Sequence, residues 1–115
     1  MRYACLVYFD PQKVFNQSPE SEAVLAGNGA YDAELQASGH YVAAEALQLP
    51  ESAMTVQVRD GKMSATDGPF METKEILGGF YVLDVPDLDA ALSWAQRAPN
   101  TSYGSVEVRP VMVFG

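Results

Sequence analysis

The sequence predicts an α+β fold in which two strand–helix–strand units build one antiparallel sheet. Alternating or β-branched apolar runs mark the strands, and apolar residues at helical spacing follow the first strand of each unit. A two-residue hairpin signal, Asp60-Gly61, lies between the units. The 115 residues, 48% of them hydrophobic, suffice for a single self-sufficient domain over residues 1–115.

The first unit begins with residues 2–9, whose aromatic and β-branched side chains predict a buried strand. Residues 11–19 contain two prolines and predict a loop. A helix is predicted over residues 20–38, with Gly39 as its stop, and a short second strand over residues 41–47. The residues that would form the buried face of this helix are Val24, Tyr31 and Leu35.

A hairpin extension is predicted between the two units. Prolines and polar residues turn the chain at 50–53, and apolar and polar residues then alternate over 54–59, which predicts a half-buried strand. The Asp60-Gly61 turn leads into an antiparallel return over 62–66. The apolar side chains of the first strand are Met54, Val56 and Val58.

The second unit begins with a predicted strand over residues 76–85. Asp87 is a suitable N-cap for a helix that Pro99 ends, and the last strand is predicted over 105–114. The resulting order is that of a ferredoxin-like βαββαβ fold, with both helices on one face of the sheet. The predicted sheet-facing residues of the second helix are Leu88, Ala91, Leu92 and Ala95.

Several strands of this sheet are apolar on both faces. In the last strand, Val106 and Val108 would face the helices, which leaves Glu107 and Arg109 on the open face. The strands over 2–9 and 76–85 carry apolar residues in both alternating sets, so both of their faces need cover. Two helices supply one cover, and we expect a second copy of the chain to supply the other, as a homodimer through the sheet face.

Composition excludes several classes of protein. The chain has 15 acidic and 7 scattered basic residues, a net charge of −8, which argues against a nucleic-acid partner. No apolar run approaches the ~18 residues of a membrane span, and the N-terminal run is too short for a signal peptide, so we expect a cytoplasmic protein. With Cys5 and His40 as its single cysteine and histidine, the sequence offers neither a disulfide nor a zinc site, and no cofactor is expected.

The densest group of ionisable residues follows the hairpin, in the run DGPFMETKE at 67–75. Asp67, Glu72 and Glu75 are candidates for acid–base catalysis, and Lys74 is a candidate for stabilising developing negative charge. A structural explanation is also open, since an Asp before Gly-Pro organises turns and charged clusters are usually solvated. Gly78 and Gly79 follow and would let another backbone or a ligand approach closely.

Four further residues are candidates for ligand binding, each with a structural alternative. Glu107 and Arg109 form either a pair at the dimer seam or a pair facing a ligand. Tyr81 is either a core aromatic or part of a cleft wall. His40 is either a helix-end residue or a catalytic one.

The segments DGPFMETKE, LGGFYVLDV, DLDAALSWA and GSVEVRP resemble the DGPF subgroup of the YCII-related family. The resemblance implies a dimeric α+β barrel of ferredoxin-like protomers. It also implies kinship with muconolactone isomerase-like proteins and with a dehydrochlorinase that acts on a chlorinated aromatic. A His–Asp pair is the active site proposed for that family, but His40 follows the first helix here rather than lying early in it.

Two functions follow as hypotheses. The first is a cofactor-independent enzyme, of isomerase or lyase type, that transfers protons on a small molecule in a cleft between sheet and helices, with Lys74 and Arg109 stabilising charge. The alternative is a non-catalytic small-molecule-binding or regulatory module that uses the same cleft.

Overall fold

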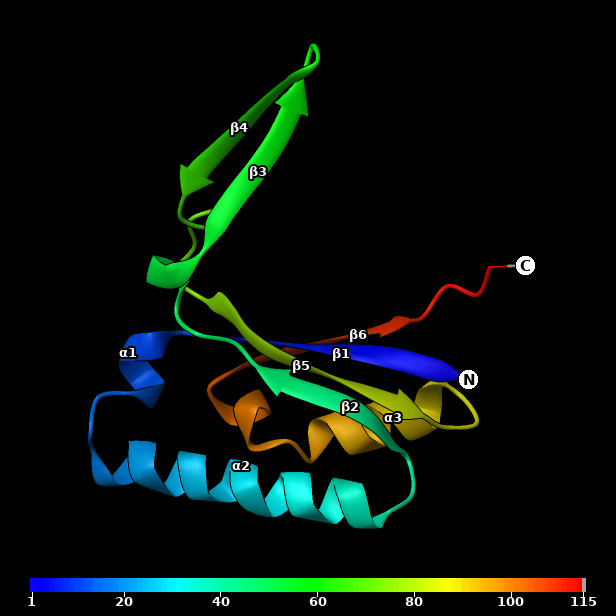
Figure 1. The fold of residues 1–115 in the computed structure, drawn as a ribbon. Coiled ribbons are helices and arrows are strands. Elements are labelled where there is room, and N and C mark those ends of the chain that lie inside the picture. The colour runs from blue at the N-terminus through cyan, green and yellow to red at the C-terminus, as the bar shows by residue number, and fades with distance from the viewer. Residues whose placement is uncertain (115) are drawn as a thin grey trace.

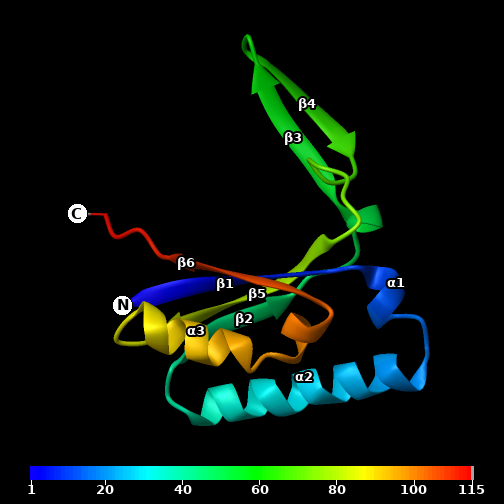
Figure 2. The same cartoon turned by 180° about the vertical axis from the view of Figure 1, so that it is seen from behind.

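The computed structural model describes residues 1–114, apart from the side chains of Val24 and Leu25. Its centre is a four-stranded antiparallel sheet in the order β2-β5-β1-β6 (Figure 1). The strands are β1 (Arg2–Phe9), β2 (Tyr41–Ala46), β5 (Ile76–Asp84) and β6 (Gly104–Pro110). Helices α2 (Pro19–Ala37) and α3 (Leu88–Gln96) lie together on one face, as the view from behind also shows (Figure 2). The predicted ferredoxin-like arrangement is therefore confirmed.

The core lies between this sheet face and the two helices. Alternate residues of β1, namely Tyr3, Cys5, Val7 and Phe9, are buried there. Leu35 of α2 packs into the same core, as predicted, and Tyr31 lies at its margin, whereas the side chain of Val24 falls outside the described part of the chain.

Helix α3 approaches the sheet through small residues rather than through the predicted leucines. Ala91 and Ala95 are buried, as is Ala98 just beyond the helix, whereas Leu88 and Leu92 are half-exposed. At 3.6 residues per turn, Leu92 lies about 100° around the helix from Ala91 and so leaves the contact face. The prediction for Leu88 and Leu92 was therefore wrong, because alanines let the helix backbone pack closer than leucines would.

Three elements are joined by a pair of tyrosines. The Tyr31 hydroxyl of α2 donates to the Trp94 carbonyl oxygen of α3 at 2.8 Å and lies 3.3 Å from the Tyr81 hydroxyl of β5. The Tyr31 ring also meets the Tyr81 and Trp94 rings edge to face. These hydroxyls are thus satisfied within the core, which fixes the positions of both helices on the sheet.

Strands β3 (Met54–Arg59) and β4 (Lys62–Asp67) form a separate two-stranded sheet, here called the arm, that stands on the face opposite the helices (Figure 1). The predicted turn is confirmed, since Asp60 and Gly61 both have positive φ, at 53° and 75°. The prediction of a half-buried strand was wrong, because no described part of this chain covers the arm. Its uncovered apolar side chains include Met54, Val56 and Val58.

Two other segments differ from the sequence prediction. Part of the predicted loop at 11–19 forms a short helix, α1 (Pro11–Val14), whose first turn is capped by the Asp10 carboxylate accepting from the Gln12 amide at 3.0 Å. The last strand ends at Pro110 rather than at Phe114. Its pairing partner β1 begins at Arg2, whose carbonyl oxygen accepts from the Val111 amide, so residues 112–114 have no strand to pair with.

The contact between β1 and β6 predicts opposite outcomes for two glycine substitutions. A Cβ at Gly104 would overlap the Tyr8 carbonyl oxygen, so Gly104→Ala is expected to lower the free energy of unfolding by about 1–3 kcal/mol. Gly29, inside α2, has open space around it, so Gly29→Ala is expected to raise that energy by up to about 1 kcal/mol. Urea denaturation of both variants measures the two effects, and equal shifts would contradict this packing.

Burial of the Cys5 thiol predicts a loss of stability in alkali. Burial raises the pKa of Cys5 from 9.0 to about 11, so the unfolded chain loses this proton first as the pH rises. The stabilisation is therefore complete below pH 9 and is lost as the pH rises toward 11. Urea denaturation across this range should give a flatter decline for Cys5→Ala than for the natural chain, and parallel curves would contradict the assignment.

Candidate functional site

The DGPF segment begins where the arm returns to the body of the protein. Gly68 has φ of 104°, a conformation that favours glycine, and its amide donates to the Ala53 carbonyl oxygen at 2.7 Å. The Thr55 hydroxyl donates to the Gly68 carbonyl oxygen at 2.8 Å. Backbone groups and Thr55 therefore hold this turn, while Asp67 ends β4 opposite Met54 with its side chain exposed.

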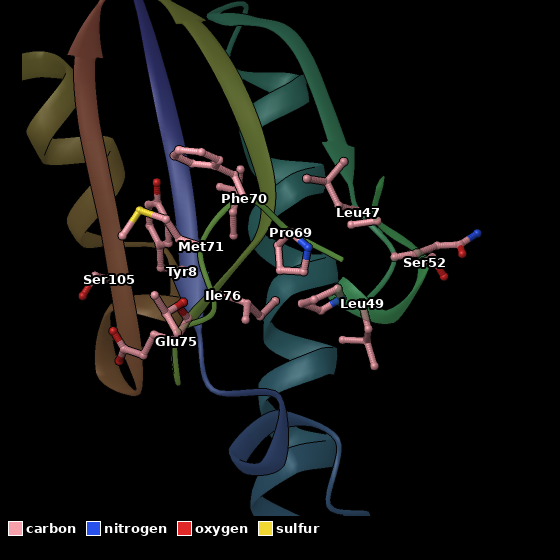
Figure 3. A pocket seen from close by; sticks show the side chains of 15 residues that line it. Tyr8, Leu47, Leu49, Ser52, Pro69, Phe70, Met71, Glu75, Ile76 and Ser105 are labelled. Carbon is pink, nitrogen blue, oxygen red and sulfur yellow. The ribbon is translucent and has the colours of Figure 1, made fainter. Parts of the chain in front are cut away.

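A cavity of about 980 Å³ lies between this segment, the chain around η1 (Pro50–Ser52) and the open face of the sheet (Figure 3). Most of its wall is apolar. The apolar lining residues are Leu47, Leu49, Pro50, Ala53, Pro69, Phe70, Met71, Ile76 and Leu77, together with the ring of Tyr8. Figure 3 shows these side chains converging from three parts of the chain that are distant in sequence. The size and composition of this cavity are typical of small-molecule sites, which combine apolar walls with few polar groups.

Of the three predicted acid–base residues, only Glu75 lines this cavity. The other polar groups around it include the side chains of Thr73 and Ser105. The Thr73 hydroxyl donates to the Glu75 backbone carbonyl oxygen, which ties the end of the segment just before β5 begins. The polar residues that line this apolar cavity therefore include one carboxylate, that of Glu75, and the hydroxyl-bearing Thr73 and Ser105.

Glu72 and Lys74 lie on a different, shallower groove. That groove is bounded by Asp10, Glu51 and Gly68 and by the other side of the DGPF segment. The charged run of the motif is thus divided between two surfaces. The structure does not bring Asp67, Glu72 and Glu75 together at one cavity.

The two glycines after the motif leave room for close packing. A Cβ at Gly78 would overlap the Phe9 ring, and one at Gly79 would lie 2.9 Å from the Glu45 carbonyl oxygen of β2. The pairing of β1 with β5 also shifts register between Val7 and Tyr8, opposite these glycines. Of the two reasons considered for this pair, close approach of another backbone is observed at Gly79, whereas Gly78 makes room for the side chain of Phe9.

Glu107 and Arg109 lie on the open face, as predicted, while Val106 and Val108 pack toward the core. The side chains of Glu107 and Arg109 form an ion pair, in which Arg109 Nε lies 2.6 Å from Glu107 Oε2. Neither residue lines the 980 Å³ cavity. With the Arg109 side chain 70% exposed, this pair contributes at most about 1 kcal/mol to stability.

Tyr81 and His40 do not line the cavity on the open face of the sheet. Tyr81 faces the helices, where it borders a smaller space of about 400 Å³ beneath α2. Burial raises the pKa of Tyr81 and of Tyr31, so both hydroxyls stay protonated at neutral pH. His40 lies between α2 and β2, with Nδ1 3.0 Å from the Asp84 carbonyl oxygen and its ring beside Trp94.

The location predicted for the chemistry therefore needs correction. The motif carboxylates do not line the space between sheet and helices, and the cavity that Glu75 borders lies on the opposite, open face. The reason is topological, because the motif follows the arm and the arm stands on that face. Sequence reasoning also missed the apolar wall, whose one visible signal was Phe70-Met71, two large apolar residues inside a polar loop.

The described residues contain neither a metal-binding cluster nor a membrane-spanning helix. Among the described residues, no three His, Cys, Asp or Glu side chains gather closely enough to hold a metal ion. Within residues 1–114, no helix is long and apolar enough to cross a membrane.

Comparison with known proteins places this geometry in a family. A solved structure, the 5-chloro-2-hydroxyhydroquinone dehydrochlorinase of Burkholderia phenoliruptrix AC1100 in complex with 2,5-dihydroxybenzoquinone, superposes with a TM-score of 0.57. That match covers 97% of this chain and 94% of the other at 15% sequence identity, and it shows a shared fold. An uncharacterised protein of Rhizobium meliloti (strain 1021) is 36% identical over 117 residues, with 99% of this chain and 94% of that protein covered. The YCII-related domain matches residues 1–115, and the chain belongs to this family.

Proposed function

We propose that the open-face cavity binds a small hydroxylated aromatic or quinone. The observation that carries this proposal is a wall of apolar side chains, with Phe70 and Tyr8 as aromatic surfaces and a carboxylate at the margin. A flat ring gains dispersion and stacking against such surfaces, while ring hydroxyls need a few polar partners. The quinone bound to the structurally similar dehydrochlorinase belongs to the same chemical class.

The proposed reaction is proton transfer without a cofactor, of isomerase or lyase type. Glu75 is the group that would accept a proton from the bound ring and return one. The Ser105 hydroxyl at the same cavity can hydrogen-bond a ring oxygen, whereas the Thr73 hydroxyl donates to the Glu75 carbonyl oxygen and can only accept from a ring hydroxyl.

One observation favours the alternative, a non-catalytic binding or regulatory module. Among the described acidic side chains, Glu75 alone lines this cavity, so no second carboxylate orients it or shares its proton. Binding and turnover are therefore tested separately.

A cytoplasmic location is part of the same proposal. The sequence has one cysteine, and the Cys5 thiol is free and buried in the sheet. Unpaired thiols are common in reducing compartments, where disulfides are rare.

Binding is tested with 2,5-dihydroxybenzoquinone as the probe, by isothermal titration. Phe70→Ala is expected to weaken binding about tenfold, because it removes one of the two aromatic side chains of the wall. Phe15→Ala is the matched control, since it removes a half-exposed ring from the helix side of the sheet. Equal affinities of the Phe70→Ala variant and the natural chain would contradict the assignment of this cavity.

Proton transfer is tested by following replacement of the probe's ring hydrogens by deuterium from D₂O, using proton NMR. Glu75→Gln is expected to slow the protein-dependent exchange at least about a hundredfold, the usual contribution of a general base. Glu72→Gln is the control, because Glu72 borders the neighbouring groove. Binding without protein-dependent exchange would support the non-catalytic module, and undiminished exchange in Glu75→Gln would remove Glu75 from the mechanism.

A further inference from the structure

The residues on the floor of the open-face cavity follow the order of the strands in the sheet. Tyr8 of β1 pairs directly with Leu77 of β5 on one side and with Ser105 of β6 on the other. Directly paired residues of an antiparallel ladder point to the same face, so these three lining side chains form one row. Leu47 continues the row beyond β5, because its amide donates to the Gly78 carbonyl oxygen at 2.9 Å. The floor therefore runs from leucines at the β2 edge of the sheet to a serine at β6.

The end of the cavity at β6 is polar. Figure 3 shows Glu75 and Ser105 on the same side of the cavity, away from the leucines. The Glu75 carboxylate can accept from a ring hydroxyl, and the Ser105 hydroxyl can donate to a ring oxygen. Tyr8, which lies beside Ser105 in the row, provides a flat aromatic surface next to these groups.

The end of the cavity beyond β2 is mainly apolar. Leu47 and Leu49 lie on this side in Figure 3, and their exposed fractions of 43% and 37% leave much of each side chain free to contact a ligand. The polar lining residues of the same stretch, Gln48 and Ser52, are exposed. Ser52 also lies farther out in the view than either leucine. A ligand group that reaches this end therefore meets leucine side chains first.

A single ring does not fill the cavity. 2,5-Dihydroxybenzoquinone has ten non-hydrogen atoms and occupies at most about 300 Å³, even if each atom is given the ~30 Å³ of a whole water molecule. Since the cavity measures about 980 Å³, such a ring leaves roughly two-thirds of it for another part of the ligand.

The length of the floor indicates the size of that missing part. The row from Leu47 to Ser105 crosses three strand spacings, from β2 through β5 and β1 to β6, which is about 14 Å at ~4.8 Å each. A benzoquinone ring measures about 5 Å between opposite oxygens, at bond lengths of ~1.2 Å for C=O and ~1.5 Å for C–C. The remaining ~9 Å is the extended length of about seven carbon atoms at ~1.5 Å per bond.

We propose that the ligand of this cavity is an amphiphilic ring, whose oxygens lie at Glu75 and Ser105 and whose alkyl chain of roughly six to seven carbons lies on Leu47 and Leu49. This inference rests on the proposed function, which assigns the ring but not its substituent. The polarity of the two ends sets the orientation. In the reverse orientation, the ring oxygens would lie against leucines without hydrogen-bond partners, and the chain would lie against a carboxylate.

The substituent is tested by isothermal titration of the natural chain with 2,5-dihydroxybenzoquinone and with its 3-hexyl derivative. The hexyl compound is expected to bind at least about thirtyfold more tightly, since complete burial gives about fourfold for each methylene group. Equal affinities would overturn this inference and leave the proposed function standing. Binding of neither compound would overturn both, and measurable binding of the hexyl compound alone would support the inference.

Variants at the two ends test the orientation. Leu49→Ser is expected to weaken binding of the hexyl compound about tenfold and binding of the parent ring less than about twofold. Ser105→Ala is expected to weaken binding of both compounds equally, by about fivefold, because it removes a hydrogen bond to the ring. If Ser105→Ala instead removed the gain from the hexyl chain while Leu49→Ser weakened both compounds, the ligand would lie the other way round and the inference would be wrong.

A matched leucine on the helix side controls for adsorption of the alkyl chain to any exposed apolar side chain. Leu92 of α3 is half-exposed, at 46% against 37% for Leu49, and it does not line the cavity. Leu92→Ser is expected to leave the affinity of the hexyl compound unchanged. A loss equal to that of Leu49→Ser would overturn the inference, and circular dichroism of each variant checks that it is folded.

Discussion

Both long helices cover the same face of a four-stranded sheet, and the remaining features of the molecule depend on that constraint. A right-handed crossover after β1 and another after β5 place α2 and α3 on one side. Tyr31 holds them there by contacting Trp94 and Tyr81. The opposite face is left to the arm, the DGPF segment and residues 111–114, and no helix among the described residues covers it.

The candidate site is defined more by its apolar wall than by its charges. The charged motif residues attract attention in the sequence, yet Glu75 is the one that reaches the cavity, and Glu72 borders a different groove. The wall combines residues from β1, from the chain around η1 and from the DGPF segment. A wall of this kind suits a flat, weakly polar molecule, and together with Glu75, the one motif carboxylate that lines it, it is the basis of the function proposed above.

Particular elements show how far the sequence could predict the fold. Period-two alternation identified the sheet strands and placed Glu107 and Arg109 on the open face, because strand side chains must alternate. Helical periodicity was less reliable in α3, where apolar residues extend over more than half the circumference. The size of the side chains then decided which face of α3 contacts the sheet, and Ala91 rather than Leu92 packs there. For the arm, alternation separated an apolar face from a polar face, but the expected burial of the apolar face is not seen, because no described part of the chain lies over it.

The sequence by itself determined the strand and helix order, the hairpin turn at Asp60-Gly61, and the family to which the chain belongs. These properties depend on local backbone preferences and on motifs that are contiguous in the chain. Only the tertiary structure decided that Phe70 and Tyr8 share a cavity with Glu75, and that Asp67 does not. Such contacts join residues that are distant in sequence, and their geometry depends on how the arm leaves the sheet, which no local pattern encodes.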